Sequence, residues 1–230
     1  MILGFNVGRL GELSLKETID LHRELGCNAI EINLGEADDQ ERMTRVKELT
    51  AEDLAFFEYV SVHAPARDMV YGEDDLTKRV LGDIQELYER FHFKYAVMHP
   101  DRIKDWSIFK DYSFPVATEN MDNKKEIART VDSLKTLFQK VDIPMVLDMN
   151  HCYVNDNTLQ LAADMYSAFK DRIVQIHLSG FKTFHEPLYE TKQAQIIRAV
   201  PDKNLPIILE STVTSEEGIR AEYEYVKNNL

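Results

Sequence analysis

The sequence predicts an α/β protein built as one closed (β/α)8 barrel over residues 1–230. Eight short runs rich in apolar or β-branched residues recur along the chain, and polar segments with helical periodicity separate most of them. Because parallel strands need a crossover of about a dozen residues, this alternation predicts a parallel sheet. A closed barrel of about 250 residues is the usual arrangement of eight such units.

The alternative for alternating strands and helices is an open, doubly wound sheet. Such sheets usually carry a Gly-rich phosphate loop after the first strand, with the pattern G-x-G-x-x-G or G-x-x-x-x-G-K. The segment "NVGRLGEL" that begins at Asn6 matches neither pattern. No Pro/Gly/Ser-rich linker and no low-complexity segment divides the chain, so we expect a single domain.

The predicted strands are short and mostly apolar, as the strands of a buried parallel sheet are. In chain order they are "ILGFNV" from Ile2, "AIEINL" from Ala29, "YVSVHAP" from Tyr59, "KYAVMHP" from Lys94, "FPVATEN" from Phe114, "PMVLDMN" from Pro144, "IVQIHLS" from Ile173 and "PIILEST" from Pro206.

Helices are predicted from apolar residues spaced three and four apart. Ser14 and Glu17 form a capping box before "LKETIDLHREL", and this helix ends at Gly26. The stretch between His99 and Phe114 supplies only a short helix. The other predicted helices are "DDLTKRVLGDIQELYERF" from Asp74, "KKEIARTVDSLKTLFQKV" from Lys124, "DNTLQLAADMYSAFKD" from Asp156 and "SEEGIRAEYEYVKNN" from Ser215.

Composition and charge exclude several functional classes. The net charge of −13 argues against a nucleic-acid surface, because phosphates attract clusters of Lys and Arg. Cys27 and Cys152 are too few for a disulfide framework. No apolar run approaches the ~20 residues needed to cross a membrane, and the N-terminal residues lack the features of a signal peptide. We therefore expect a cytoplasmic protein that binds neither nucleic acid nor membranes.

Six consecutive predicted strands end in side chains that can bind a metal ion. These side chains are His63, His99, Glu119, Asp148, His177 and Glu210. Two more histidines lie in the predicted loops after strands six and seven, His151 and His185. The carboxyl ends of barrel strands form one rim, which holds the active site in essentially every characterised barrel enzyme. One such strand end would be typical of a structural histidine, but six in succession predict a functional site.

Imidazole nitrogens and carboxylate oxygens suit Zn²⁺, Mn²⁺, Fe²⁺ or Co²⁺. Adjacent strands lie about 4.8 Å apart, so their end residues can converge on one ion or on a close pair. We expect one to two divalent ions per chain, because crowded carboxylates without a cation would be costly. The core of the predicted site consists of Glu119, Asp148, His177 and Glu210. His63 and His99 are either further ligands or part of the substrate pocket.

Three other residues are candidates for binding substrate. Glu31 and Asn33 alternate with apolar residues on the second predicted strand, so they either face the same pocket or form an internal hydrogen-bond layer. Lys182 lies in a predicted rim loop, where it either meets an anionic group of the substrate or is solvated.

The strand-end motifs, in this order, resemble those of the xylose isomerase-like TIM barrel superfamily. This group includes sugar phosphate isomerases and epimerases and endonuclease IV (AP endonuclease family 2). The resemblance covers nearly the whole chain. It rests on "HAP" at His63, "HP" at His99, "EN" at Glu119, D-x-x-H at Asp148 and His151, "HLS" at His177, "HEP" at His185 and "LES" at Glu210.

The epimerase and isomerase branch implies one divalent ion held by Glu119, Asp148, His177 and Glu210. That ion would bind a ketose carbonyl and the neighbouring hydroxyl. Glu119 and Glu210 would lie on opposite faces of the substrate, where one takes a proton from carbon and the other returns it through an enediolate. A bound cation lowers the cost of the negative charge that develops on oxygen.

The endonuclease IV branch implies three zinc ions and cleavage of a phosphodiester. His63, His99 and Glu119 resemble the ligands of one ion, and Glu119 would bridge to the second. A third ion would use His151 and a D-x-H pair, of which only His185 remains because Thr183 occupies the Asp position. This departure and the acidic composition weaken the resemblance to a DNA-cleaving enzyme.

A third alternative is a binding barrel that kept the fold and lost the chemistry. Both catalytic-type glutamates, Glu119 and Glu210, are present, which argues against it. The sequence therefore predicts a metal-dependent isomerase or epimerase of a small sugar, polyol or sugar phosphate. A metal-dependent phosphoesterase is the second prediction.

Overall fold

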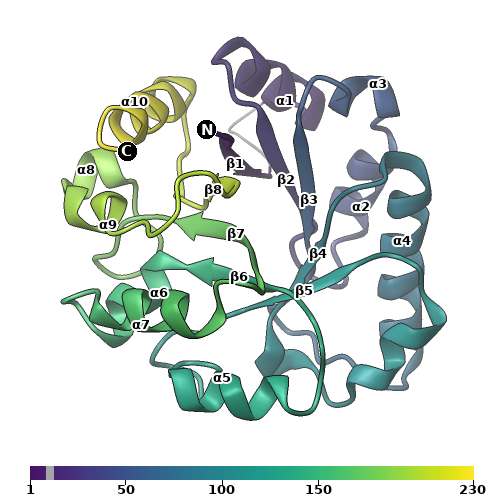
Figure 1. Ribbon diagram of the computed structural model, residues 1–230. Coiled ribbons are helices and arrows are strands. Elements are labelled where there is room, and N and C mark those ends of the chain that lie inside the picture. The colour runs from purple at the N-terminus through teal and green to yellow at the C-terminus, as the bar shows by residue number, and fades with distance from the viewer. Residues whose placement is uncertain (9–12) are drawn as a thin grey trace.

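Eight parallel strands pair in chain order and close into a barrel in the computed structural model, which describes residues 1–8 and 13–230 (Figure 1). The first strand pairs with the last as well as with the second, and this closes the sheet. The predicted fold class is therefore confirmed. The strands are β1 Leu3–Val7, β2 Ala29–Asn33, β3 Tyr59–His63, β4 Ala96–Met98, β5 Val116–Glu119, β6 Met145–Asp148, β7 Ile173–Leu178 and β8 Ile207–Leu209.

Helices surround the strands on the outside of the barrel (Figure 1). The capping box predicted at the first helix is present: Ser14 Oγ accepts from the Glu17 N–H, and Glu17 Oε2 accepts from the Ser14 N–H. Two 3₁₀ segments, Pro100–Arg102 and Trp106–Asp111, follow β4, where only a short helix was expected. The helices are α1 Leu15–Glu24, α2 Gln40–Lys47, α3 Ala51–Leu54, α4 Asp75–Phe91, α5 Val131–Phe138, α6 Met149–Asn155, α7 Gln160–Phe169, α8 Leu188–Thr191, α9 Ala194–Arg198 and α10 Glu216–Lys227.

The helix predicted from Lys124 is half as long as expected. Residues 124–130 form turns and bends, and α5 begins only at Val131. Ala128 has a φ of +57°, which is incompatible with a continuous right-handed helix. Its carbonyl accepts from the Met121 N–H at 2.9 Å, so this segment folds back against the rim of the barrel. Helical periodicity alone therefore misassigned the segment.

The residues after Asp148 form a helix that the sequence analysis did not predict. Helix α6 begins directly at Met149, and Asp148 is its N-cap, accepting from the His151 N–H at 2.7 Å. His151 was expected in a loop and lies instead in the first turn of this helix. The D-x-x-H motif thus has a structural role as a helix cap.

Alternate residues of each strand point into the barrel. Apolar residues such as Ala29, Val97 and Val146 form two small clusters that are separate from the main core. Gly4 is required here, since a Cβ atom at this position would lie 1.7 Å from the carbonyl oxygen of Ala29. The main core lies elsewhere, where the strands pack against the helices.

No helix within residues 1–8 and 13–230 combines the length and the apolarity needed to span a bilayer.

Candidate metal centre

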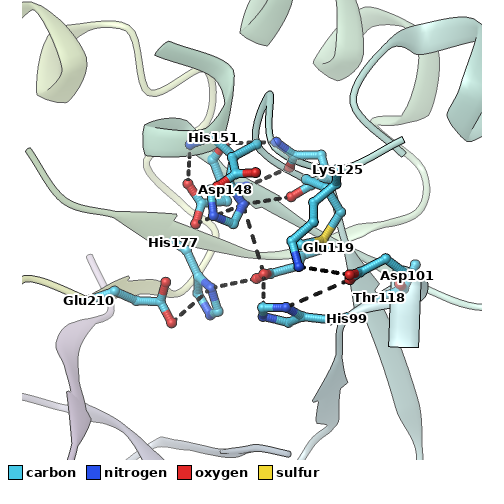
Figure 2. Close-up of polar contacts among 12 residues, drawn as sticks. His99, Asp101, Thr118, Glu119, Lys125, Asp148, His151, His177 and Glu210 are labelled. Atoms are coloured by element: carbon cyan, nitrogen blue, oxygen red, sulfur yellow. Dashed lines mark hydrogen bonds and ion pairs between the residues drawn. The ribbon is translucent and has the colours of Figure 1, made fainter. Parts of the chain in front are cut away.

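Four side chains predicted as the core of a metal site meet at the rim of the barrel (Figure 2). Each of them offers one ligand-type atom, and these atoms lie within 4.8 Å of one another. They lie at the carboxyl ends of four consecutive strands: Glu119 in β5, Asp148 in β6, His177 in β7 and Glu210 directly after β8. Parallel strands bring these residues together because all their carboxyl ends lie at the same rim.

A second group shares one residue with the first. His63, His99 and Glu119 also offer atoms within 4.8 Å of one another. His99 Nε2 lies 2.9 Å from Glu119 Oε1, and the His63 and His99 rings are 5.1 Å apart. Glu119 therefore links the two groups: its Oε1 atom contacts His99, and its Oε2 atom contacts His177.

His177 lies at the centre of the first group and is fully buried. Its Nδ1 atom is 3.1 Å from Glu119 Oε2 and 3.3 Å from Glu210 Oε1. Its Nε2 atom faces the opposite direction, 3.2 Å from Glu31 Oε1 and 2.6 Å from the amide nitrogen of Gln175. The imidazole thus joins the rim to a polar layer beneath it.

The electrostatics of this group favour a positive charge at its centre. Burial opposes protonation of His177, but the carboxylates of Glu210, Glu31 and Glu119 outweigh burial and raise its pKa well above the usual range. Burial likewise opposes ionisation of Glu210, yet the charge and hydrogen bond of His177 bring the pKa of Glu210 to about 2. A positive charge on the His177 imidazole thus favours the ionised form of Glu210, and the carboxylate in turn favours the protonated imidazole.

The carboxylate of Asp148 has only one of its two oxygens satisfied by hydrogen bonds from the described residues. Its Oδ1 atom caps α6, but its Oδ2 atom is buried and has no hydrogen-bond partner within residues 1–8 and 13–230, where His151 Nδ1 comes only to 3.5 Å. Burial raises the pKa of this carboxyl group. An unpaired buried carboxylate oxygen is costly unless a cation satisfies it. The unpaired oxygen and the set of nitrogen and oxygen donors around it fit a divalent metal ion.

His151 and His185 lie beside the site but outside the two groups of candidate ligands found among the described residues. His151 Nδ1 is 2.8 Å from the Asn120 carbonyl oxygen and 3.5 Å from Asp148 Oδ2. His185 Nδ1 is 2.8 Å from Ser179 Oγ, and the two imidazole rings are 5.6 Å apart. Both side chains line the cleft above the rim.

The three predicted substrate-binding residues lie in different places. Glu31 is fully buried beneath the rim, where Asn6, Ser61 and Gln175 donate hydrogen bonds to its carboxylate. Asn33 lines the cleft. Lys182 is exposed in the loop after β7 and is not among the residues that line the cleft. The structure thus separates Glu31 and Lys182 from the cleft and retains Asn33.

The cleft has a volume of about 690 Å³ and contains cationic residues that the sequence analysis did not identify as part of the site. Among them are Arg42, Arg102, Lys124 and Lys125. Lys125 Nζ lies 2.7 Å from Asp101 Oδ2, beside His99 (Figure 2). The position of Lys125 at the cleft was not predicted, because its segment has the apolar periodicity of a helix. No sequence signal marked Arg42, since helix α2 was not predicted.

No family model and no curated protein matches this chain. Solved structures do match. A D-tagatose 3-epimerase-like protein has a TM-score of 0.70 at 18% identity, covering 100% of this chain and 97% of its own. The 3-keto-D-glucoside 4-epimerase YcjR from E. coli has a TM-score of 0.67 at 10% identity, with 99% of both chains covered.

A third structure is the D-psicose 3-epimerase from Clostridium cellulolyticum H10. Its TM-score is 0.65 at 12% identity, and the match covers 100% of this chain and 99% of its own. Two of these three structural neighbours are sugar epimerases and one is an epimerase-like protein, and identities this low establish the fold alone. The chain therefore shares the (β/α)8 barrel fold of these structures.

Proposed function

We propose that this protein is a divalent-metal-dependent isomerase or epimerase of a small sugar or sugar phosphate. The observation that carries the proposal is the convergence of Glu119, Asp148, His177 and Glu210 within 4.8 Å of one another. Two of the structural neighbours named above are epimerases, one of a ketose and one of a keto-glucoside, and the third is an epimerase-like protein, which supports the same class of substrate.

In this proposal Glu119, Asp148, His177 and Glu210 hold the metal ion. A bound divalent ion supplies Lewis-acid polarisation of a carbonyl oxygen and stabilises negative charge that develops on it. Asp148 is suited to the role of a ligand alone, because one of its oxygens is committed to capping α6. Glu119 and Glu210 both approach the Nδ1 atom of His177.

Glu119 and Glu210 act as the proton carriers. One carboxylate removes the proton from the carbon next to the carbonyl, and the other, in its acid form, returns a proton to the opposite face. The two side chains approach His177 Nδ1 from β5 and from the end of β8, which lie on different sides of the barrel. This separation gives each of them access to a different face of a substrate bound over the rim.

A metal-dependent phosphoesterase is the second candidate. The group formed by His63, His99 and Glu119 favours it, because a shared carboxylate between two ligand groups suits a pair of ions. The endonuclease IV branch that this candidate resembles would also need ligands for a third ion, and that set of ligands is incomplete here. Thr183 stands at the Asp position, and its hydroxyl donates to Glu186 within the same loop.

Two measurements test the proposal. Elemental analysis of protein purified without chelator or nickel should find about one divalent ion per chain; two or three would favour the phosphoesterase. Incubation with a panel of ketohexoses in D₂O containing Mn²⁺ should place deuterium next to the carbonyl carbon, detected by NMR. A protein that contains an ion but exchanges no proton with any ketose would be a binding barrel or a phosphoesterase.

A further inference from the structure

Asn33 and Asn6 form a chain of hydrogen bonds at the edge of the candidate metal centre. Asn33 Oδ1 accepts from the backbone N–H of Gly35 at 2.7 Å and from Arg42 Nη1 at 3.4 Å. Backbone N–H groups and guanidinium groups only donate, so these two bonds determine which end of the Asn33 amide is the oxygen. Asn33 Nδ2 must then face Asn6, and it donates to Asn6 Oδ1 at 2.8 Å.

The orientation of Asn6 follows from that of Asn33. With its oxygen occupied, Asn6 presents its Nδ2 atom to two carboxylates. It donates to Glu31 Oε1 at 2.8 Å and to Glu210 Oε1 at 3.1 Å. An amide nitrogen has two hydrogens, so both bonds can form at once. Every hydrogen bond in the chain therefore runs in one direction, from Gly35 to the carboxylates.

The starting point of this chain is a turn that requires glycine. Gly35 has a φ of +73°, in the left-handed region that glycine adopts without strain. A Cβ atom at Gly35 would also lie 2.7 Å from Arg42 Nε. The turn that directs the Gly35 N–H at Asn33 therefore depends on both the conformation and the small size of this residue.

We propose that Asn6 is a positioning residue that holds the carboxylate of Glu210, and that Asn33 sets the amide orientation in which Asn6 does so. This inference rests on the proposed function, in which Glu210 is a metal ligand and a proton carrier. A turned-over Asn6 amide would place its oxygen against the Glu31 and Glu210 carboxylates. That arrangement replaces two charge-assisted hydrogen bonds with two repulsive contacts.

The substitution Asn33→Asp tests the chain without touching a proposed ligand. An Asp at this position still accepts from the Gly35 N–H but has no hydrogen to donate to Asn6, which then turns over to donate to the new carboxylate. Loss of such supporting hydrogen bonds typically lowers metal affinity 10- to 100-fold. We expect this loss in Mn²⁺ affinity measured by calorimetry, together with a changed visible spectrum of the Co²⁺-loaded protein. Asn6→Leu should shift both readouts in the same direction.

The sign of the effect distinguishes the chain of hydrogen bonds from simple electrostatics. An added negative charge near a cation site should by itself strengthen cation binding. Asn28→Asp is the matched control, because Asn28 lies at the opposite end of the barrel, where its side chain bonds the Leu3 N–H and Glu58. This control should bind Mn²⁺ as the unmodified protein does.

Three outcomes would overturn the inference. Mn²⁺ binding by Asn33→Asp that is equal to or tighter than that of the unmodified protein would show that no such positioning exists. Equal losses in Asn33→Asp and Asn28→Asp would show a general disturbance of the fold by Asn-to-Asp substitution rather than loss of this chain of hydrogen bonds. Absence of Mn²⁺ and Co²⁺ binding by the unmodified protein would overturn both this inference and the proposed function, whereas the first two outcomes leave the proposed function standing.

Discussion

His177 Nδ1 lies 3.1 Å from Glu119 Oε2, although the two residues are 58 positions apart in the sequence. The contact places an imidazole nitrogen against a fully buried carboxylate, and Glu210 approaches the same nitrogen from the other side. A proton on Nδ1 satisfies both carboxylates, and a divalent ion in its place would do the same. The proton and the ion therefore compete for one position.

This competition predicts that metal affinity rises with pH. The pKa of His177 is raised well above its usual range by the surrounding carboxylates, so an ion must displace a proton at neutral pH. Displacing one proton raises the apparent affinity about tenfold per pH unit until the pH exceeds that pKa. Calorimetry at pH 6, 7 and 8 in buffers of different ionisation enthalpy should detect release of about one proton. A flat affinity with no proton release would contradict the arrangement.

Glu210→Gln should abolish inversion at the substrate carbon, because inversion needs a proton carrier on each face. The amide carries no acidic proton and cannot act as the base, and loss of a positioned acid or base typically costs about 10²- to 10⁴-fold in rate. Conversion of the substrate to its epimer, followed by NMR, measures the effect. Glu222→Gln is the control, because Glu222 is another buried carboxyl group, and its carboxylate accepts from the Leu188 and Tyr189 N–H groups and the Ser211 hydroxyl without belonging to either group of candidate ligands among the described residues. Undiminished epimerisation by Glu210→Gln would show that Glu210 takes no part in proton transfer.

His63→Ala separates the two candidate functions. Within the part of the chain that the structure describes, His63 belongs only to the group with His99 and Glu119, so an isomerase should keep its single ion after the substitution. A phosphoesterase should lose one ion of two. His177→Ala removes a member of the other group and should lose the single ion of the isomerase. Metal content per chain distinguishes these outcomes, and loss of the only ion in His63→Ala would contradict the proposed ligand set.

His22 predicts a loss of stability in mild acid that is independent of the rim. Burial lowers its pKa to about 4, from an unperturbed value of 6.5. Between these values the unfolded chain binds a proton that the folded chain does not, so stability falls as the pH drops from 6.5 to 4. At 1.36 kcal/mol per unit, the difference amounts to about 3 kcal/mol.

The variant His22→Gln isolates this contribution, because it does not titrate. Chemical denaturation of both proteins at pH 7 and pH 4 should show that the unmodified protein loses about 3 kcal/mol more than the variant. Equal losses in the two proteins would mean that His22 is protonated in the folded state.

The sequence by itself determined the fold class and the residues at the strand ends. Strand and helix periodicities are local, and the carboxyl ends of parallel strands must share one rim, so Glu119, Asp148, His177 and Glu210 could be brought together without coordinates. The segment from Lys124 showed the limit of this reasoning. Its local pattern is helical. The structure instead has a hydrogen bond from the Met121 N–H to the Ala128 carbonyl and an ion pair between Lys125 and Asp101, and neither contact can be predicted from helical periodicity.

Only the tertiary structure decided what lies beneath and around the rim. Glu31 was a candidate for substrate binding, but barrel closure brings Asn6, Ser61 and Gln175 onto its carboxylate and removes it from the cleft. Barrel closure also brings Asn6 next to Glu210, 204 positions away. Such contacts depend on strand register and on which amide end faces which neighbour. Neither property leaves a periodic pattern in the sequence, since each is a property of packed side chains rather than of the local chain.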